Sequence, residues 1–160
     1  MTGVAQLGYL GFEVQNLAAW EQFSTNILGL EIVNRQEDGS FGLCMDSHQQ
    51  RFFITPGEAD DLVVAGWQVE NQDALDALVK RLEGDGIEIT QGTPEEAKAR
   101  MVQALVKFTD PAGNPFEVCY GAEKAESTFE SKVVHRGFIA EDQGLGHVVV
   151  HANDQAESGA

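Results

Sequence analysis

The sequence predicts an α+β fold in which two β-α-β-β-β modules, residues 5–58 and 60–122, pair to form one domain. Two observations lead to this prediction. The same order of strand-like and helix-like patterns occurs twice, which is typical of a duplicated supersecondary unit. In addition, the tripeptide at residues 14–16, Val-Gln-Asn, is matched 55 residues later by Val-Glu-Asn at residues 69–71.

The first module begins with an apolar, glycine-rich stretch at residues 7–14, which predicts a strand. Asn16 then occupies the position of a helix N-cap, and Gly29 the position of a C-cap. Between them, apolar residues at intervals of three and four predict one helix: Leu17, Trp20, Phe23, Ile27 and Leu28. Turn residues then separate three expected strands, at residues 31–35, 40–45 and 50–55.

The second module repeats this order, starting with an expected strand at residues 62–69. Asn71 or Asp73 caps the helix that follows, and the glycines at residues 84–86 end it. A short helix is expected to start at Thr93-Pro94-Glu95-Glu96, because Thr and Glu three residues apart form a capping box. The remaining strands are expected at residues 87–90, 102–109 and 115–120.

The chain then changes character. Residues 123–136 are mostly charged and polar and are expected to form a linker. Within residues 137–160, several glycines precede an expected strand around residues 148–150, and this pattern resembles the start of both modules. We therefore interpret residues 137–160 as the truncated start of a further domain.

Composition excludes several classes of function. The 160 residues include 26 Asp and Glu against 10 Lys and Arg, which gives a net charge of −16. This charge argues against binding to nucleic acid or to an anionic membrane surface. No apolar run approaches the roughly 20 residues of a spanning helix, and the N-terminus lacks the features of a signal peptide. Two cysteines are too few for a disulfide framework, so we expect reduced thiols and a cytoplasmic protein.

Few residues are candidates for chemistry. His147 stands at the entrance of an apolar strand, where a neutral imidazole can bind a divalent metal, although a histidine without a metal remains the alternative. His151 would lie roughly 13 Å further along that strand, too far to bind the same ion. His48 and His135 are expected to be solvated surface residues. Cys119 stands in an expected apolar strand between Val118 and Tyr120 and is expected to be a buried, unreactive thiol.

Several stretches together resemble one known family. They are Leu7-Gly8-Tyr9-Leu10-Gly11, Ala19-Trp20, Leu28-Gly29-Leu30, Asp61-Leu62, Ala65-Gly66-Trp67, Arg100-Met101, Asp110-Pro111-Ala112-Gly113-Asn114-Pro115 with Glu117, and Asp142-Gln143-Gly144-Leu145-Gly146-His147. In this order they resemble the N-terminal half of type I extradiol ring-cleaving dioxygenases. That group belongs to the vicinal oxygen chelate (glyoxalase and bleomycin-resistance) superfamily and acts on dihydroxybiphenyl, dihydroxynaphthalene and steroid catechols.

The resemblance implies that paired modules curl a sheet around a cavity and that Fe(II) sits in a C-terminal domain. Two His and one Glu hold the iron there, and a catechol and dioxygen are the substrates. His147 matches one metal ligand and Val149 a position that lines the substrate pocket, whereas no catalytic residue is matched. Tyr9, Val64 and Cys119 stand where ligands would stand, which implies that both complete modules are metal-free. We also expect a homo-oligomer.

Three functions remain open. The first is the N-terminal portion of an Fe(II)-dependent extradiol dioxygenase, in which case this chain alone should retain no iron and be inactive. The second is a metal-free small-molecule binding or sequestering protein of the same superfamily, with a cavity lined by aromatic residues such as Trp67 and Phe116. The third is a metalloenzyme assembled across a dimer, with His147 supplied by each chain.

Overall fold

The computed structural model describes residues 3–154 and 156 and contains one eight-stranded sheet with three α-helices. The elements of the first module are β1 (Gln6–Val14), α1 (Leu17–Gln22), a π-helix (Phe23–Ile27), β2 (Glu31–Val33), β3 (Phe41–Cys44) and β4 (Phe52–Pro56). Those of the second are β5 (Asp61–Gln68), α2 (Gln72–Gly84), β6 (Thr90–Gln91), α3 (Pro94–Ala99), β7 (Ala104–Thr109) and β8 (Pro115–Tyr120).

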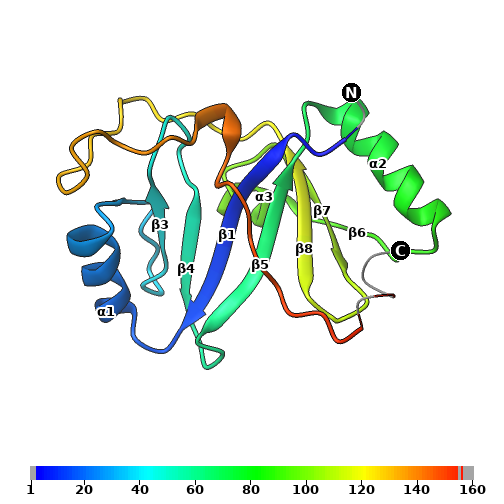
Figure 1. Ribbon diagram of the computed structural model, residues 1–160, viewed down its shortest axis with the longest axis horizontal. Helices are drawn as coiled ribbons and strands as arrows, with labels where there is room; N and C mark the ends of the chain where they lie inside the picture. Colours follow the sequence, from blue (N-terminus) through cyan, green and yellow to red (C-terminus); the bar gives the residue numbers. More distant parts are fainter. Residues whose placement is uncertain (1–2, 155, 157–160) are drawn as a thin grey trace.

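The order of the strands confirms the prediction of paired modules. The sheet runs β2-β3-β4-β1-β5-β8-β7-β6, so the strands of one module follow the reverse spatial order of the other. Within each module the first and last strands pair in parallel, β1 with β4 and β5 with β8. The modules meet where β1 and β5 pair antiparallel in the middle of the sheet (Figure 1).

Glycines on β1 and β5 leave space for aromatic rings from the neighbouring strands to pack over the backbone. Tyr9 pairs with Gly66, and a Cβ atom at residue 66 would lie 2.2 Å from the Tyr9 ring. On the neighbouring strand, a Cβ atom at Gly11 would lie 2.0 Å from the ring of Phe53. Both glycines therefore provide space for side chains that the fold places against the backbone.

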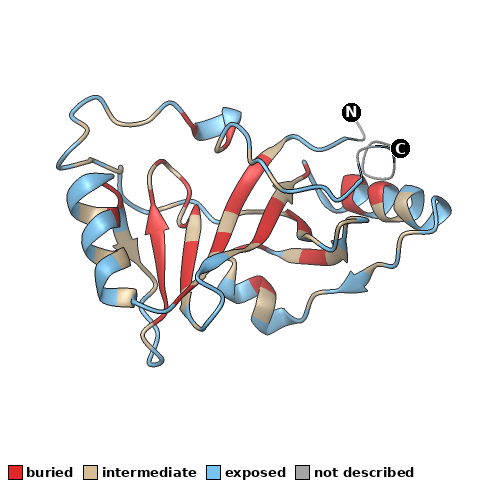
Figure 2. Cartoon of the chain, turned by 60° about the horizontal axis from the view of Figure 1, so that its bottom comes forward, coloured by how far each residue is buried: buried red, intermediate tan, exposed pale blue. Residues whose placement is uncertain are grey.

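Three buried clusters hold the helices against the sheet. In Figure 1, α1 and α2 lie toward opposite ends of the sheet and α3 lies behind it. The cluster beside α1 contains Val14, Leu30, Phe41, Leu43 and Ile54, and the one beneath α2 contains Val69, Ala74, Leu75, Leu78, Val106 and Val118. The third, on the side of α3, contains Tyr9, Phe53, Val64, Ala97, Val102, Leu105 and Cys119 and is called the inner cluster below. Figure 2 shows these buried residues concentrated in the strands.

Some predicted elements differ in detail. The helix expected to run from residue 17 to residue 28 is α1 followed by the π-helix. Ser24 and Thr25 each donate a side-chain hydrogen bond to the carbonyl four residues earlier, at 2.7 and 2.8 Å, which perturbs the regular helix. The strand expected at residues 87–90 is confined to Thr90–Gln91.

The segment after β8 also differs from expectation. The proposed linker does contact the first module, since Lys124 forms a β-bridge with His48 and Ser131 Oγ donates to Gly29 O at 2.7 Å. The strand expected around residues 148–150 does not form. Residues 141–143 form a short 3₁₀-helix, and the chain beyond it passes in front of β1 and β5 in Figure 1. Within the described residues, no helix is long and apolar enough to cross a membrane.

The cap of α2 provides the first testable prediction. The Asn71 side chain accepts a hydrogen bond from Ala74 N at 3.0 Å, and α2 buries Leu75 and Leu78. We expect Asn71→Ala to lower the free energy of unfolding by about 1 kcal/mol in urea denaturation. Asn26→Ala, at an exposed position, should change it by less than about 0.5 kcal/mol. Equal effects of the two substitutions would contradict the cap assignment.

Candidate functional site

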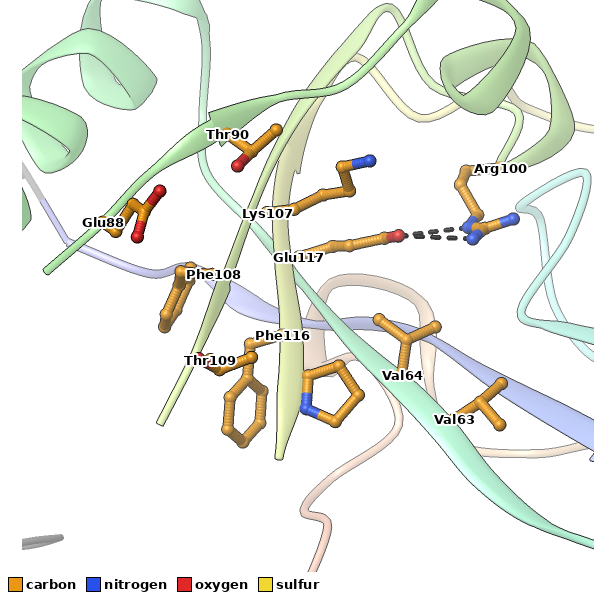
Figure 3. Close-up of a pocket in the computed structure, with 11 residues that line it drawn as sticks. Val63, Val64, Glu88, Thr90, Arg100, Lys107, Phe108, Thr109, Phe116 and Glu117 are labelled. Carbon is orange, nitrogen blue, oxygen red and sulfur yellow. Dashed lines mark hydrogen bonds and ion pairs between the residues drawn. The ribbon is translucent and has the colours of Figure 1, made fainter. Parts of the chain in front are cut away.

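A polar triad lies at the centre of the inner cluster. Tyr9 Oη donates to Glu117 Oε2 at 2.5 Å, and Arg100 donates to both carboxylate oxygens of Glu117 at 3.1 and 3.2 Å. The Arg100 guanidinium also lies 3.8 Å from the centre of the Phe53 ring. Figure 3 shows the Arg100–Glu117 pair bridging α3 and β8. Glu117 is 4% exposed, so its charge is held by these neighbours rather than by water.

Burial raises the pKa values of Cys119 and Tyr9, the two groups of the inner cluster that could lose a proton. Burial, together with the charge of Glu117, raises the pKa of the Cys119 thiol to about 12. Burial also raises the pKa of Tyr9 well above its usual value, with smaller contributions from Cys119 and Glu117. Cys119 is buried, as expected, and its raised pKa favours the neutral thiol near pH 7.

The inner cluster brings together the three positions at which the resemblance places metal ligands. Tyr9, Val64 and Cys119 all belong to it. Val64 has no donor atom, and the other two groups hold their protons tightly, while Glu117 is engaged by Arg100. An Fe(II) site needs deprotonated oxygen or nitrogen donors with open positions. The residues present therefore do not fit iron.

A cavity of about 450 Å³ opens beside this triad. Its lining comes mainly from β5, β7 and β8, and Figure 3 shows the rings of Phe108 and Phe116, 5.9 Å apart between centres, on the opposite side of the strands from Lys107 and Glu117. Arg100 and Glu117 also line the cavity. All residues that line this cavity belong to the second module, so it is not the cavity between modules expected for a binding protein. Phe116 lines it, whereas Trp67 packs beneath α2.

A second polar cluster surrounds Arg51 and Asp46, next to the linker. The Arg51 and Asp46 side chains are 0% and 1% exposed, and Arg51 Nε and Nη2 donate to the Asp46 carboxylate at 2.9 and 2.5 Å. His48 N donates to the same carboxylate at 3.0 Å. The prediction that His48 is a solvated surface residue is wrong, because it is 2% exposed. Its ring lies against Lys124, which is 76 residues away in the sequence.

This cluster holds the ligand atoms of Asp46, His48 and Glu141 within 4.8 Å of one another. Two cationic side chains already occupy its neighbourhood. Arg51 pairs with Asp46, and Lys124 Nζ lies 3.1 Å from His48 Nε2. A divalent cation would be repelled by both charges and would have to replace the Arg51 hydrogen bonds, so these residues do not fit a metal.

The residues matched by resemblance lie elsewhere. His147 is exposed and Val149 is 85% exposed, on the segment that crosses β1 and β5. The structure therefore places these two residues together but joins neither to the inner cluster nor to the Asp46 cluster. His135 is exposed, as expected. The sequence analysis did not predict that Asp46 and Arg51 form a buried ion pair. The two residues lie close together in the sequence, between β3 and β4, so their opposite charges could have indicated the pair.

Comparison with known proteins gives a consistent result. Residues 7–57 match the family model described as dihydroxybiphenyl dioxygenase BphC D1. The chain is 34% identical to biphenyl-2,3-diol 1,2-dioxygenase of Sphingomonas paucimobilis, over 96% of this chain and 52% of that protein. It is 36% identical to 1,2-dihydroxynaphthalene dioxygenase of Pseudomonas sp. strain C18, over 97% of this chain and 52% of that protein.

Solved structures agree with the sequence comparison. The crystal structure of a catechol 2,3-dioxygenase superposes with a TM-score of 0.91 at 36% identity, covering 97% of this chain and 53% of that one. The halotolerant catechol dioxygenase BphC superposes with a TM-score of 0.93 at 31% identity, covering 99% of this chain and 53% of that one. In each of these comparisons nearly the whole chain is similar to about half of an extradiol or catechol dioxygenase.

The extradiol dioxygenase relatives confirm the fold class and the resemblance inferred from the motifs. The chain spans about half the length of these relatives. One of them, from Rhodococcus jostii strain RHA1, is named an iron-dependent extradiol dioxygenase.

Proposed function

We propose that this chain is the N-terminal portion of an Fe(II)-dependent extradiol dioxygenase that cleaves aromatic catechols with dioxygen. Residues 1–122 would form its non-catalytic domain, residues 123–136 a linker, and residues 137–160 the start of its catalytic domain. The observation that supports this most strongly is similarity over 96% of the chain to half of a biphenyl-2,3-diol dioxygenase. The inner cluster is consistent with it, because its donors are protonated or paired with Arg100. The same proposal includes a cytoplasmic homo-oligomer.

Within this proposal His147 is the one iron ligand that the chain supplies, and Val149 lines the catechol pocket. When bound, Fe(II) would hold the catechol oxygens and dioxygen next to each other. One imidazole cannot replace a set of three ligands, so the isolated chain should neither retain iron nor turn over substrate. Its own contribution would be a rigid scaffold on which the segment with His147 lies.

The test uses the chain alone and as part of a chimera. The chain incubated with Fe(II), ascorbate and 2,3-dihydroxybiphenyl should form no yellow ring-cleavage product. A chimera in which this chain replaces the matching half of the Sphingomonas paucimobilis enzyme should form it. In that chimera, His147→Ala should lower both the iron content and turnover by about 100-fold or more.

His151→Ala in the same chimera serves as the matched control, because His151 is also exposed but is matched to no ligand. It should leave iron content and turnover near those of the parent chimera. Turnover by the isolated chain would overturn the proposal. So would a folded chimera that is inactive, or one in which His147→Ala and His151→Ala behave alike.

The cavity beside Arg100 supports a second candidate, a metal-free small-molecule binding protein. Its volume of about 450 Å³ lies in the range of ligand sites, and its lining includes the apolar residues Val64 and Phe116. Titration with 2,3-dihydroxybiphenyl, followed by NMR shifts of residues lining the cavity, tests it. Saturable binding that Phe116→Ala weakens would favour this function, and a flat titration would count against it.

A further inference from the structure

The buried ion pair of Asp46 and Arg51 also makes hydrogen bonds to a distant part of the chain. Both side chains also bind the backbone of Glu141, which is 90 residues or more away in the sequence. We propose that Asp46 and Arg51 form a docking site in the first module for the peptide groups of Glu141. This site would anchor the start of the segment that leads to His147.

The two partners of the pair bind the two backbone groups of one residue. Arg51 Nη2 donates to Glu141 O at 2.8 Å, and Glu141 N donates to Asp46 Oδ2 at 3.0 Å. Because Arg51 and Asp46 are also hydrogen-bonded to each other, the four groups close a ring. Such a ring holds both the N–H and the C=O of Glu141 in one position. The hydrogen bonds are also strong, because each of them involves a charged side chain.

The Glu141 side chain adds a second set of contacts. Its carboxylate accepts hydrogen bonds from Ser47 N at 3.1 Å and from Ser47 Oγ. Lys124 Nζ in turn donates to Ser47 Oγ at 3.1 Å. The hydrogen bond from Ser47 lowers the pKa of Glu141, so the charged form is the one bound.

Backbone geometry indicates that this contact holds Glu141 in place. Glu141 has φ of 47°, a left-handed conformation that a residue with a side chain adopts at a cost. The conformation persists because the surrounding contacts over-determine it. If the segment moved away, Arg51 Nη2 would lose Glu141 O as an acceptor. The loss of a hydrogen bond by this buried guanidinium would cost free energy.

The anchored residue directs the following chain onto β1. Gly144 has φ of 66° and lies so close to β1 that a Cβ atom there would be 2.6 Å from Leu7 O. Leu145 N then donates to the same Leu7 oxygen at 3.0 Å. Two residues later the chain reaches His147. The anchor and the Leu145 contact together define where the segment crosses the sheet.

Two substitutions at residue 141 test the docking site without touching the buried pair. Glu141→Pro removes the N–H that donates to Asp46 and cannot adopt a φ of 47°. Glu141→Gly keeps the N–H, the carbonyl and the left-handed conformation, and loses only the carboxylate. Hydrogen exchange of the Leu145 amide in the full 160-residue chain, measured by NMR, reports whether the segment stays on β1.

We expect the Leu145 amide to exchange about tenfold faster or more in Glu141→Pro, which corresponds to about 1.4 kcal/mol, and within about threefold of the parent in Glu141→Gly. The urea midpoint of Glu141→Gly should stay near that of the parent. The midpoint of Glu141→Pro should fall only modestly, because the buried pair remains and only its hydrogen bonds to Glu141 are lost. Unchanged Leu145 exchange in Glu141→Pro would overturn the docking site, as would equal acceleration in Glu141→Gly. The result does not depend on iron or turnover, so failure of the proposed function would leave it standing.

Discussion

Asp46→Asn should lower the free energy of unfolding by about 3–5 kcal/mol, the largest loss expected from a single isosteric change in this chain. The substitution keeps the shape of the side chain but leaves the Arg51 guanidinium buried without a countercharge. Arg51 is 0% exposed, so water cannot replace the lost carboxylate. Urea denaturation of parent and variant at neutral pH measures the difference.

The control for charge removal alone is Asp38→Asn, since Asp38 also accepts a backbone hydrogen bond, from Ser40 N at 2.9 Å, but is exposed. It should cost less than about 1 kcal/mol. The double variant Asp46→Leu with Arg51→Met removes both charges and should be more stable than Asp46→Asn. Equal losses in Asp46→Asn and Asp38→Asn would show that the buried pair does not stabilise the fold.

The same pair predicts a pH dependence. Burial alone would raise the pKa of Asp46, but hydrogen bonds from His48 and Arg51 outweigh burial and hold that pKa well below its usual value. A lowered folded-state pKa adds stability above the pKa of the unfolded chain, about 3.9, and loses it as the pH falls further. The stability difference between parent and Asp46→Asn should therefore be full at pH 7 and shrink below about pH 4.

Glu117→Gln should lower the free energy of unfolding by about 2–3 kcal/mol. Glu117 holds Tyr9 and Arg100 together in the inner cluster, and a neutral amide cannot pair with the guanidinium. The Arg100 side chain is 18% exposed, so water screens its charge in part and the expected loss is smaller than at Asp46. Urea denaturation and the change in the Tyr9 ring signals by NMR measure the effect.

Tyr9→Phe provides the companion to Glu117→Gln, because it removes one hydrogen bond and keeps the ring in place. It should cost about 1 kcal/mol by itself. In a double-mutant cycle the two losses should not add, because Glu117→Gln weakens and Tyr9→Phe removes the same Tyr9–Glu117 hydrogen bond. Strict additivity would show that the phenol and the carboxylate act independently.

Local patterns were sufficient to predict most of the fold. Asn16, Asn71 and Thr93 each cap a helix as predicted, because a cap involves residues only a few positions apart. The repeat of strand and helix patterns likewise predicted two modules, and the sheet order confirms them. The interruption of the first helix at Phe23 was missed, since the apolar residues continue at intervals of three and four across it.

The candidate site was predicted only in part. The resemblance pointed to Tyr9, Val64 and Cys119 as equivalent positions, and the structure does bring these three residues into one cluster. It could not show that Arg100 pairs with Glu117, because that contact depends on how α3 packs against the sheet. His147 and Val149, exposed on their segment, stay a proposal that rests on the resemblance and the chimera experiment.

The sequence by itself determined the two modules, the helix caps, the acidic character and the resemblance to extradiol dioxygenases, because each of these is encoded by neighbouring residues or by ordered motifs. Only the tertiary structure decided that His48 is buried and that Arg51 and Asp46 bind Glu141. The physical reason is separation along the chain. Asp46 and Arg51 are close in sequence, but the Glu141 backbone that binds them and the Lys124 side chain against His48 come from distant segments that only folding brings together.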